Sequence, residues 1–138
     1  MIEKSTPTLH RTLIVYVLTL GILLFFGGTA LAVSFGEVEK NLDPDRNTKV
    51  ATQGYWKKVK GKEVTWSGTV DDVKGGRSKF KVLVKVGGSS KANVTLVTAD
   101  HKAEKLRKGQ SVSFTGTLSG YRNWFHKVSI ELKDVKIK

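Results

Sequence analysis

Cysteine is absent from the 138 residues, and the chain has only two prolines and one methionine. Without cysteine, the chain has no disulfide, no thiolate nucleophile, no cysteine-based zinc site and no lipidated cysteine. Acidic residues are also few, because 12 Asp and Glu stand against 24 Lys and Arg. The net charge of +12 favours anionic partners such as nucleic acid, acidic polysaccharide or anionic lipid headgroups, with simple solubility as the alternative explanation.

One long uncharged stretch, Leu13–Phe35, contrasts with this composition. It is long enough for a transmembrane helix, which needs about 20 mostly apolar residues. Its first part, Leu13–Phe26, also fits the apolar region of a signal peptide, with cleavage after Ala32. We therefore expect residues 1–35 to be a membrane anchor or a signal peptide. The protein is then either a single-pass membrane protein with an extracytoplasmic C-terminal domain, or secreted or periplasmic after cleavage.

Residues 36–46 are polar and are predicted to form a linker. Asp43 and Pro44 suit the cap and the first position of a short linker helix. Apolar residues then recur at four-residue spacing at Ala51, Tyr55 and Val59. Trp56 is expected to pack this helix against the following domain, and Gly61 is expected to end it. The folded domain is predicted to span residues 47–138.

From Lys62 onward the apolar pattern changes to the alternation typical of strands. Strands are predicted at 63–73, 78–86, 92–98, 111–119 and 127–136, with a short helix in 99–108. Phase slips indicate bulges near Asp71 and after Leu132. Two similar segments, Trp66–Val70 and Phe114–Leu118, each carry a glycine that permits a sharp bend. The fold class is therefore all-β: a five-stranded OB-fold barrel with adjacent strands one and four and one short helix between strands three and four. An N-terminal hydrophobic helix and the linker helix precede it.

Three segments carry a resemblance to a known family. They read Gly61-Lys62-x-Val64-x-Trp66-x-Gly68-x-Val70, then Leu106-x-Lys108-Gly109-Gln110-x-Val112-x-Phe114-x-Gly116, then Leu132-x-Asp134-x-x-Ile137. The chain resembles, over residues 47–138, the exported bacterial OB-fold proteins that are grouped by similarity to tRNA-anticodon-binding domains. The resemblance implies an OB-fold barrel in an exported protein.

Patterns typical of enzymes are missing from the sequence. The three histidines, His10, His101 and His126, lack the helical spacing of a zinc site. Asp71 and Asp72 are adjacent on a strand, so their side chains point to opposite faces and make a poor acid–base pair. We expect no enzymatic activity, no metal and no cofactor.

A binding function is better supported. OB-folds bind ligands on the face of strands two and three and on the flanking loops. Cations combined with aromatic rings on such a surface are typical of single-strand binders and also suit oligosaccharides. The candidate ligand-binding residues are Lys74, Arg77, Lys79, Lys81, Lys85, Asn93, Thr95, Tyr121, Arg122 and Trp124. In the loop 120–126, Phe125 is a further candidate, whereas Trp66, Phe80 and Phe114 are assigned to the core.

The predicted function is a non-enzymatic, membrane-anchored binding module. Its basic face would contact an anionic polymer, either single-stranded nucleic acid or acidic oligosaccharide, or the anionic membrane surface. The alternative is a module of the cell envelope that docks a partner protein and binds no polyanion.

Overall fold

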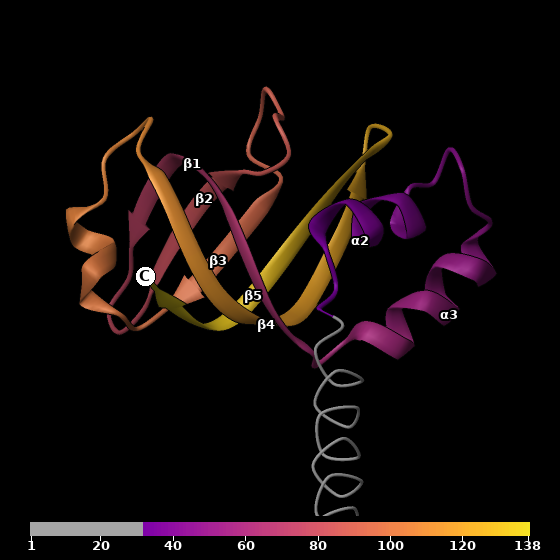
Figure 1. The fold of residues 1–138 in the computed structure, drawn as a ribbon, viewed down its shortest axis with the longest axis horizontal. Helices are drawn as coiled ribbons and strands as arrows, with labels where there is room; N and C mark the ends of the chain where they lie inside the picture. Colours follow the sequence, from indigo (N-terminus) through magenta and orange to yellow (C-terminus); the bar gives the residue numbers. More distant parts are fainter. Residues whose placement is uncertain (1–31) are drawn as a thin grey trace, which may run out of the picture. The chain divides into compact units, whose positions relative to one another are not determined.

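The predicted strands close into a barrel in the computed structural model, which describes residues 32–138 (Figure 1). The elements are α2 (Phe35–Leu42), α3 (Lys49–Val59), β1 (Glu63–Gly75), β2 (Phe80–Lys85), β3 (Val94–Thr98), the 3-10 helix η2 (His101–Lys105), β4 (Ser111–Trp124) and β5 (Lys127–Ile137). The predicted anchor or signal peptide lies outside the described residues, apart from 32–35. Among residues 32–138, no helix is both long enough and apolar enough to span a membrane.

The five strands are hydrogen-bonded in the closed order β1-β2-β3-β5-β4. All neighbouring pairs are antiparallel except β3 and β5, which run parallel. Strands β1 and β4 lie side by side, with Trp66 opposite Phe114, and η2 lies between β3 and β4 in the chain. This five-stranded barrel is the OB-fold that the strand order and the placement of the helix predict.

The barrel core consists of the inward side of each alternating strand. On β2, Val82 and Val84 are fully buried, and Phe114 on β4 is fully buried as well. Trp66 is also part of the core, as predicted. Phe80 is only half-buried and packs against the edge of the core, because it opens β2 at the end of the barrel.

Both predicted bulges are present. The pairing of β1 with β2 shifts between Val70 and Asp72, and the pairing of β4 with β5 shifts between Thr115 and Thr117. Gly68 is required by close packing, because a Cβ at this position would collide with the carbonyl oxygen of Lys85 and lie 2.7 Å from Val84 Cγ1. The glycine in the repeated segment therefore serves the architecture of the barrel, as predicted.

The structure corrects the predicted polar linker, because helix α2 occupies most of it. The Ser34 hydroxyl caps this helix by accepting a hydrogen bond from the Glu37 N–H, at 3.2 Å. One side of α2 is buried through Phe35, Val38 and Leu42. These residues follow a helical spacing that the polar residues between them conceal.

The end of the predicted anchor also belongs to the folded unit, which spans Val33–Lys138. The Trp66 indole N–H donates to the Val33 carbonyl, at 2.9 Å. The Phe35 ring meets the Trp66 ring edge-on, with 5.3 Å between the centroids. Val33 and Phe35 therefore pack against the core of the folded unit.

Helix α3 begins later than predicted. Its cap is Thr48, whose hydroxyl accepts from the Ala51 N–H at 3.2 Å. Asp43 instead forms a local turn, in which its carboxylate accepts from the Asp45 N–H at 2.9 Å. Gly61 follows the helix with φ of +86°, which confirms the predicted stop, and Trp56 packs against the core as predicted.

Candidate binding surfaces

The predicted loop at residues 120–126 is in fact the end of β4 and a tight hairpin turn. Strand β4 continues to Trp124, which pairs with Lys127 on β5. The two turn residues, Phe125 and His126, have φ of 47° and 63°. Such turns favour Asn-Gly, and a bulky side chain at positive φ costs free energy. Turn geometry alone would favour asparagine and glycine at these two positions, but the sequence has Phe125 and His126 there.

The aromatic residues of this hairpin lie in solvent. Trp124 is 74% exposed and Phe125 is 81% exposed. Their rings stack on each other, with centroids 5.6 Å apart and planes 23° apart. Arg122 lies two residues from Trp124 and Lys127 lies opposite it, so both cations share its face of the hairpin. We call Arg122, Trp124, Phe125 and Lys127 the hairpin cluster.

A contact with the helical segment holds the turn of the hairpin. His126 Nδ1 lies 2.7 Å from Asp45 Oδ1, in the turn between α2 and α3. The hairpin and this turn therefore lie side by side (Figure 1). The contact joins the turn of the hairpin to the helical segment at the surface.

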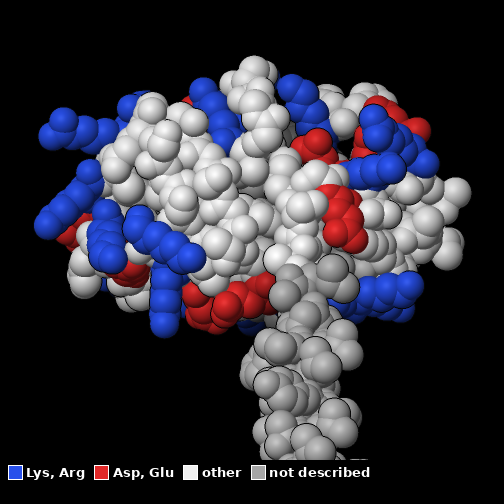
Figure 2. Space-filling model, viewed as in Figure 1, with Lys and Arg blue, Asp and Glu red and all other residues white. Residues whose placement is uncertain are grey.

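A second basic surface surrounds the turn between β1 and β2. The strand pairing places Lys74 opposite Lys81, and Arg77 and Lys79 lie in the turn between them. All four side chains are exposed. Figure 2 shows basic side chains gathered at the left-hand end of the barrel, where Figure 1 draws η2, while much of the middle of this face is uncharged. We call Lys74, Arg77, Lys79 and Lys81 the turn cluster.

The strip between the two clusters is less basic than predicted. Lys85 Nζ lies 3.5 Å from Asp71 Oδ1, so its charge is partly neutralised. Thr95 is half-buried and sits between Leu83 and the acidic Glu131 in the strand register. The predicted basic face therefore consists of two basic clusters, and the strip between them is nearly neutral.

Asn93 does not lie on the binding face, which corrects its prediction as a ligand residue. It is buried, its Oδ1 accepts from the Val86 N–H and its Nδ2 donates to the Val86 carbonyl, each at 2.8 Å. The residue precedes β3, so the alternation of that strand does not extend to it. Its amide instead closes the turn between β2 and β3.

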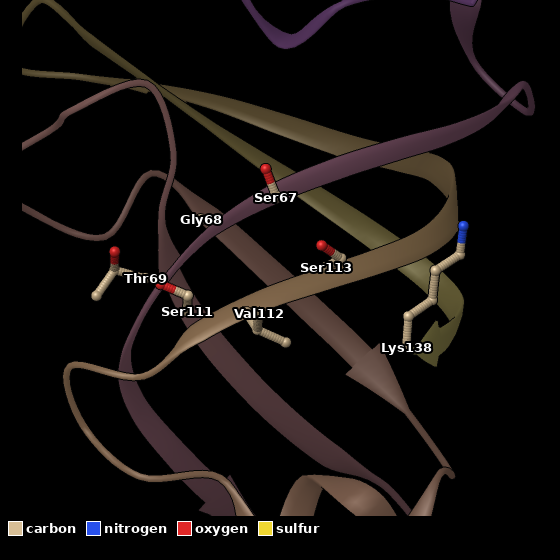
Figure 3. A pocket seen from close by; sticks show the side chains of 7 residues that line it. All are labelled: Ser67, Gly68, Thr69, Ser111, Val112, Ser113 and Lys138. Atoms are coloured by element: carbon tan, nitrogen blue, oxygen red, sulfur yellow. The ribbon is translucent and has the colours of Figure 1, made fainter.

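A shallow groove of about 700 Å3 runs along the outer side of β1 and β4 (Figure 3). Hydroxyl groups of Ser67, Thr69, Ser111 and Ser113 line it, together with Lys138. Neither a histidine nor a carboxylate side chain is part of this lining, and Lys138 is its one titratable side chain. The groove is a polar outer face of the barrel.

A second groove, of about 380 Å3, lies between α3, the turn before it and the hairpin. Its lining comprises Pro44, Asn47, Lys49, Thr52, Gln53, Tyr121 and Asn123. Tyr121, predicted as a ligand residue, is half-buried here with its ring centroid 4.9 Å from that of Trp56. The sequence does not indicate this groove, because the residues of its two walls are about 70 residues apart in the chain. The sequence also predicts that α3 starts at Pro44, whereas it starts at Lys49.

Two titratable groups with shifted pKa values lie outside both clusters and serve the fold. The Asp100 carboxylate accepts from the backbone N–H groups of Lys102 and Ile137, at 3.0 and 3.2 Å, which lowers its pKa. Burial raises the pKa of the Tyr55 phenol, and the nearby Glu37 carboxylate adds to this rise. In the part of the chain that the structure describes, no three His, Asp or Glu side chains come together as a metal site would require.

Comparisons with known proteins add distant structural likenesses. No family model matches the chain, and neither does any of the curated proteins. The chain is similar to asparaginyl-tRNA synthetase from Pyrococcus horikoshii, with 17% identity and a TM-score of 0.46 over 78% of this chain and 23% of the synthetase. It is also similar to the OBody NL8 bound to hen egg-white lysozyme, with 22% identity and a TM-score of 0.42 over 56% of this chain and 93% of the OBody. The chain thus spans less than a quarter of the synthetase, and the fold assignment stands on the strand order.

Proposed function

We propose that the barrel is a non-enzymatic binding module for an anionic polymer, a single-stranded nucleic acid or an acidic oligosaccharide, or for the anionic surface of a membrane. The hairpin cluster is the observation that carries this proposal. A purely structural role would bury Trp124 and Phe125, yet both rings are mostly exposed and stacked on each other. Exposed rings beside cations are the groups on which bases or sugars stack while the cations attract the polymer backbone.

The turn cluster supports the same function. In OB-folds the loop after strand one and the loop between strands four and five flank the binding face. Here the first loop carries the turn cluster and the second carries the hairpin cluster. A polymer that crosses the strip between them would meet cations at both ends and aromatic rings at one.

The non-enzymatic part of the proposal rests on the isolation of the reactive side chains. His101 pairs with Glu104 at 3.4 Å and His126 pairs with Asp45 at 2.7 Å, and both histidines are exposed. Neither pair lines one of the two grooves. A catalytic site would need such groups to converge on a concave surface.

We also propose that the uncharged stretch beginning at Leu13 holds the module at a membrane, or is removed by cleavage after Ala32. Because the folded unit begins at Val33, either state leaves the contacts of Val33 and Phe35 with Trp66 in place. The test is the intact mass of the protein from membrane and soluble fractions of its host. A mass of the full chain in membranes supports the anchor, and a soluble mass beginning at Val33 supports cleavage.

Polymer binding is tested by fluorescence anisotropy with a fluorescent oligo-dT and a fluorescent heparin fragment over a range of salt concentrations. Trp124→Ala is expected to weaken binding about tenfold, since a stacked base contributes about 1–3 kcal/mol. The double variant Lys79→Ala/Lys81→Ala is expected to reduce the slope of log affinity against log salt by about 1–2.

The matched control is Lys57→Ala/Lys58→Ala, which removes the same charge from the last turn of α3. It is expected to change the salt slope less than the turn-cluster variant does. Absence of binding at low salt, or binding that salt does not weaken, would contradict the electrostatic proposal.

The exposed Trp124–Phe125 pair also suits a second candidate, a module that docks a partner protein of the cell envelope. Aromatic anchors of this kind dominate many protein interfaces. Trp124→Ala would then abolish capture of the partner while leaving binding of oligo-dT and heparin unchanged. The reverse outcome favours the polymer.

A further inference from the structure

The groove between α3 and the hairpin has a chemistry of its own. Six of its seven lining residues have side chains with hydrogen-bonding groups, and Tyr121 is the one aromatic residue among them. We propose that this groove is a subsite for a single carboxylated sugar ring. The inference rests on the proposed function for the polymer, of which the ring would be one unit, and it names acidic oligosaccharide as the ligand class.

The carboxamides fit the hydroxyl groups of a sugar. Gln53 and Asn123 both donate and accept hydrogen bonds, as pairs of neighbouring sugar hydroxyls do. Asn47 Nδ2 donates to the carbonyls of Lys40 and Asp43, at 2.7 and 3.1 Å. Its side chain is thereby fixed, and its oxygen is left as an acceptor at the groove.

Thr52 adds a hydroxyl from the floor of the groove. The residue is buried, with 4% of its surface exposed, yet it lines the groove. Its backbone N–H donates to the Thr48 carbonyl at 3.0 Å, so the hydroxyl is the donor it can offer to a ligand. A buried hydroxyl at this place favours a ligand that hydrogen-bonds over an apolar one.

Lys49 supplies the positive charge that a carboxylate needs. It is exposed at the first position of α3, and the ion pairs of the described residues involve other cations. The first turn of α3 has no acidic residue, so the positive end of the helix adds to the same field. The charge distinguishes a uronic acid from a neutral sugar.

A sugar fits this groove better than a nucleobase does. A base is planar and is held by stacking, whereas the lining offers one half-buried ring, Tyr121, whose neighbour Trp56 lies 4.9 Å away. The remaining groups suit a ligand with a hydroxyl on most carbons. The volume of about 380 Å3 is at the small end of ligand sites, which suits one ring.

Two sets of contacts join the elements around the groove. His126 Nδ1 in the hairpin lies 2.7 Å from Asp45 Oδ1 in the turn before α3, with both side chains exposed. Asn47, in the same turn, is fixed by its two hydrogen bonds. A site that is already ordered costs less conformational entropy on binding.

The experiment is calorimetric titration of the full-length, detergent-solubilised protein with sodium glucuronate, glucose and sodium acetate. Glucuronate is expected to bind more tightly than either of the others. Lys49→Ala is expected to weaken glucuronate binding about tenfold, as loss of one charge-assisted hydrogen bond does, and to leave glucose unchanged. Gln53→Ala is expected to weaken the binding of both sugars. Lys57→Ala, which removes a cation from the last turn of the same helix, is expected to change the binding of neither sugar.

Equal binding of acetate and glucuronate, or no effect of Lys49→Ala and Gln53→Ala, would overturn the sugar subsite. Competition with heparin separates this inference from the proposed function. If heparin binds but glucuronate does not compete and the groove variants have no effect, the subsite fails alone. If glucuronate binds as expected but neither heparin nor oligo-dT binds, the proposed polymer function fails and the subsite stands.

Discussion

Trp66 and Trp124 lie on adjacent strands of one barrel, in opposite environments. Trp66 is 7% exposed, is covered by Phe35 and donates its indole N–H to the Val33 carbonyl. Trp124 is 74% exposed and contacts the equally exposed Phe125. The two residues differ because α2 lies over the first, whereas the end of β4 carries the second to the tip of a hairpin. A tryptophan that another element covers stabilises the fold, whereas a tryptophan at the tip of a hairpin stays exposed to solvent.

The same contrast holds for the regions around these residues. At the covered side, the Trp66 indole N–H has a hydrogen-bond partner, as burial requires. At the hairpin, two non-glycine residues adopt positive φ and two large rings remain in water. Features that lower stability without an evident structural return are typical of functional sites.

The largest expected effect comes from exchanging each tryptophan for alanine. Trp66→Ala is expected to lower the free energy of unfolding by about 3–5 kcal/mol, because it leaves a cavity under Phe35 and removes the donor to Val33. Trp124→Ala is expected to change it by less than about 0.5 kcal/mol, as exposed substitutions do. Denaturant unfolding monitored by circular dichroism measures both. Similar values for the two variants would break the contrast.

A smaller effect is expected at Gly68, two residues beyond Trp66. Gly68→Ala is expected to destabilise by about 1–3 kcal/mol, because the new methyl group collides with the Lys85 carbonyl and Val84. The matched control is Gly54→Ala in α3, where a Cβ meets nothing within 4 Å. This control is expected to stabilise by about 0.5–1 kcal/mol, since alanine favours a helix. Melting temperatures that move in the same direction would contradict the close packing at Gly68.

The smallest change in the free energy of unfolding is expected at the hairpin turn, where the substitution is expected to stabilise the protein. Phe125→Asn is expected to raise the free energy of unfolding by about 0.5–1 kcal/mol, because asparagine tolerates positive φ better than phenylalanine does. The same change is expected to weaken binding of heparin or oligo-dT, since one ring is lost. Phe125→Ala separates the two causes, because it removes the ring without relieving the backbone. A loss of stability in Phe125→Asn would show that the ring serves the fold.

Local patterns were sufficient to predict the barrel. Alternation in Ser78–Val86 predicts the buried Val82 and Val84, and the phase slips predict the bulges, because a strand on a core has a fixed period of two. Helix α2 could not be predicted in the same way. Its three buried residues are separated by polar ones and pack into the barrel core, where Phe35 contacts Trp66, which follows about 30 residues later.

The site could be predicted in composition better than in arrangement. The four residues of the turn cluster, together with Arg122 and Trp124, are exposed as expected, because turns and hairpin ends face solvent. Three other candidates make contacts within the fold: Asn93 is hydrogen-bonded to Val86, Lys85 is paired with Asp71, and Tyr121 packs against Trp56. These partners lie on other turns, strands or helices, so the contacts depend on tertiary structure that no local pattern encodes.

The parallel pair of β3 and β5 has a consequence for how the protein is made. Strand β1 can pair with β4 only after Thr117, which lies opposite Glu63, has been synthesised. Strand β3 likewise can pair with β5 only after Ile130 and Leu132 have been synthesised. Such distant pairings make folding slow, because a long loop must close before its contacts form. The barrel can therefore close only after β5 has been synthesised, and until then β3 and β4 each lack one neighbouring strand.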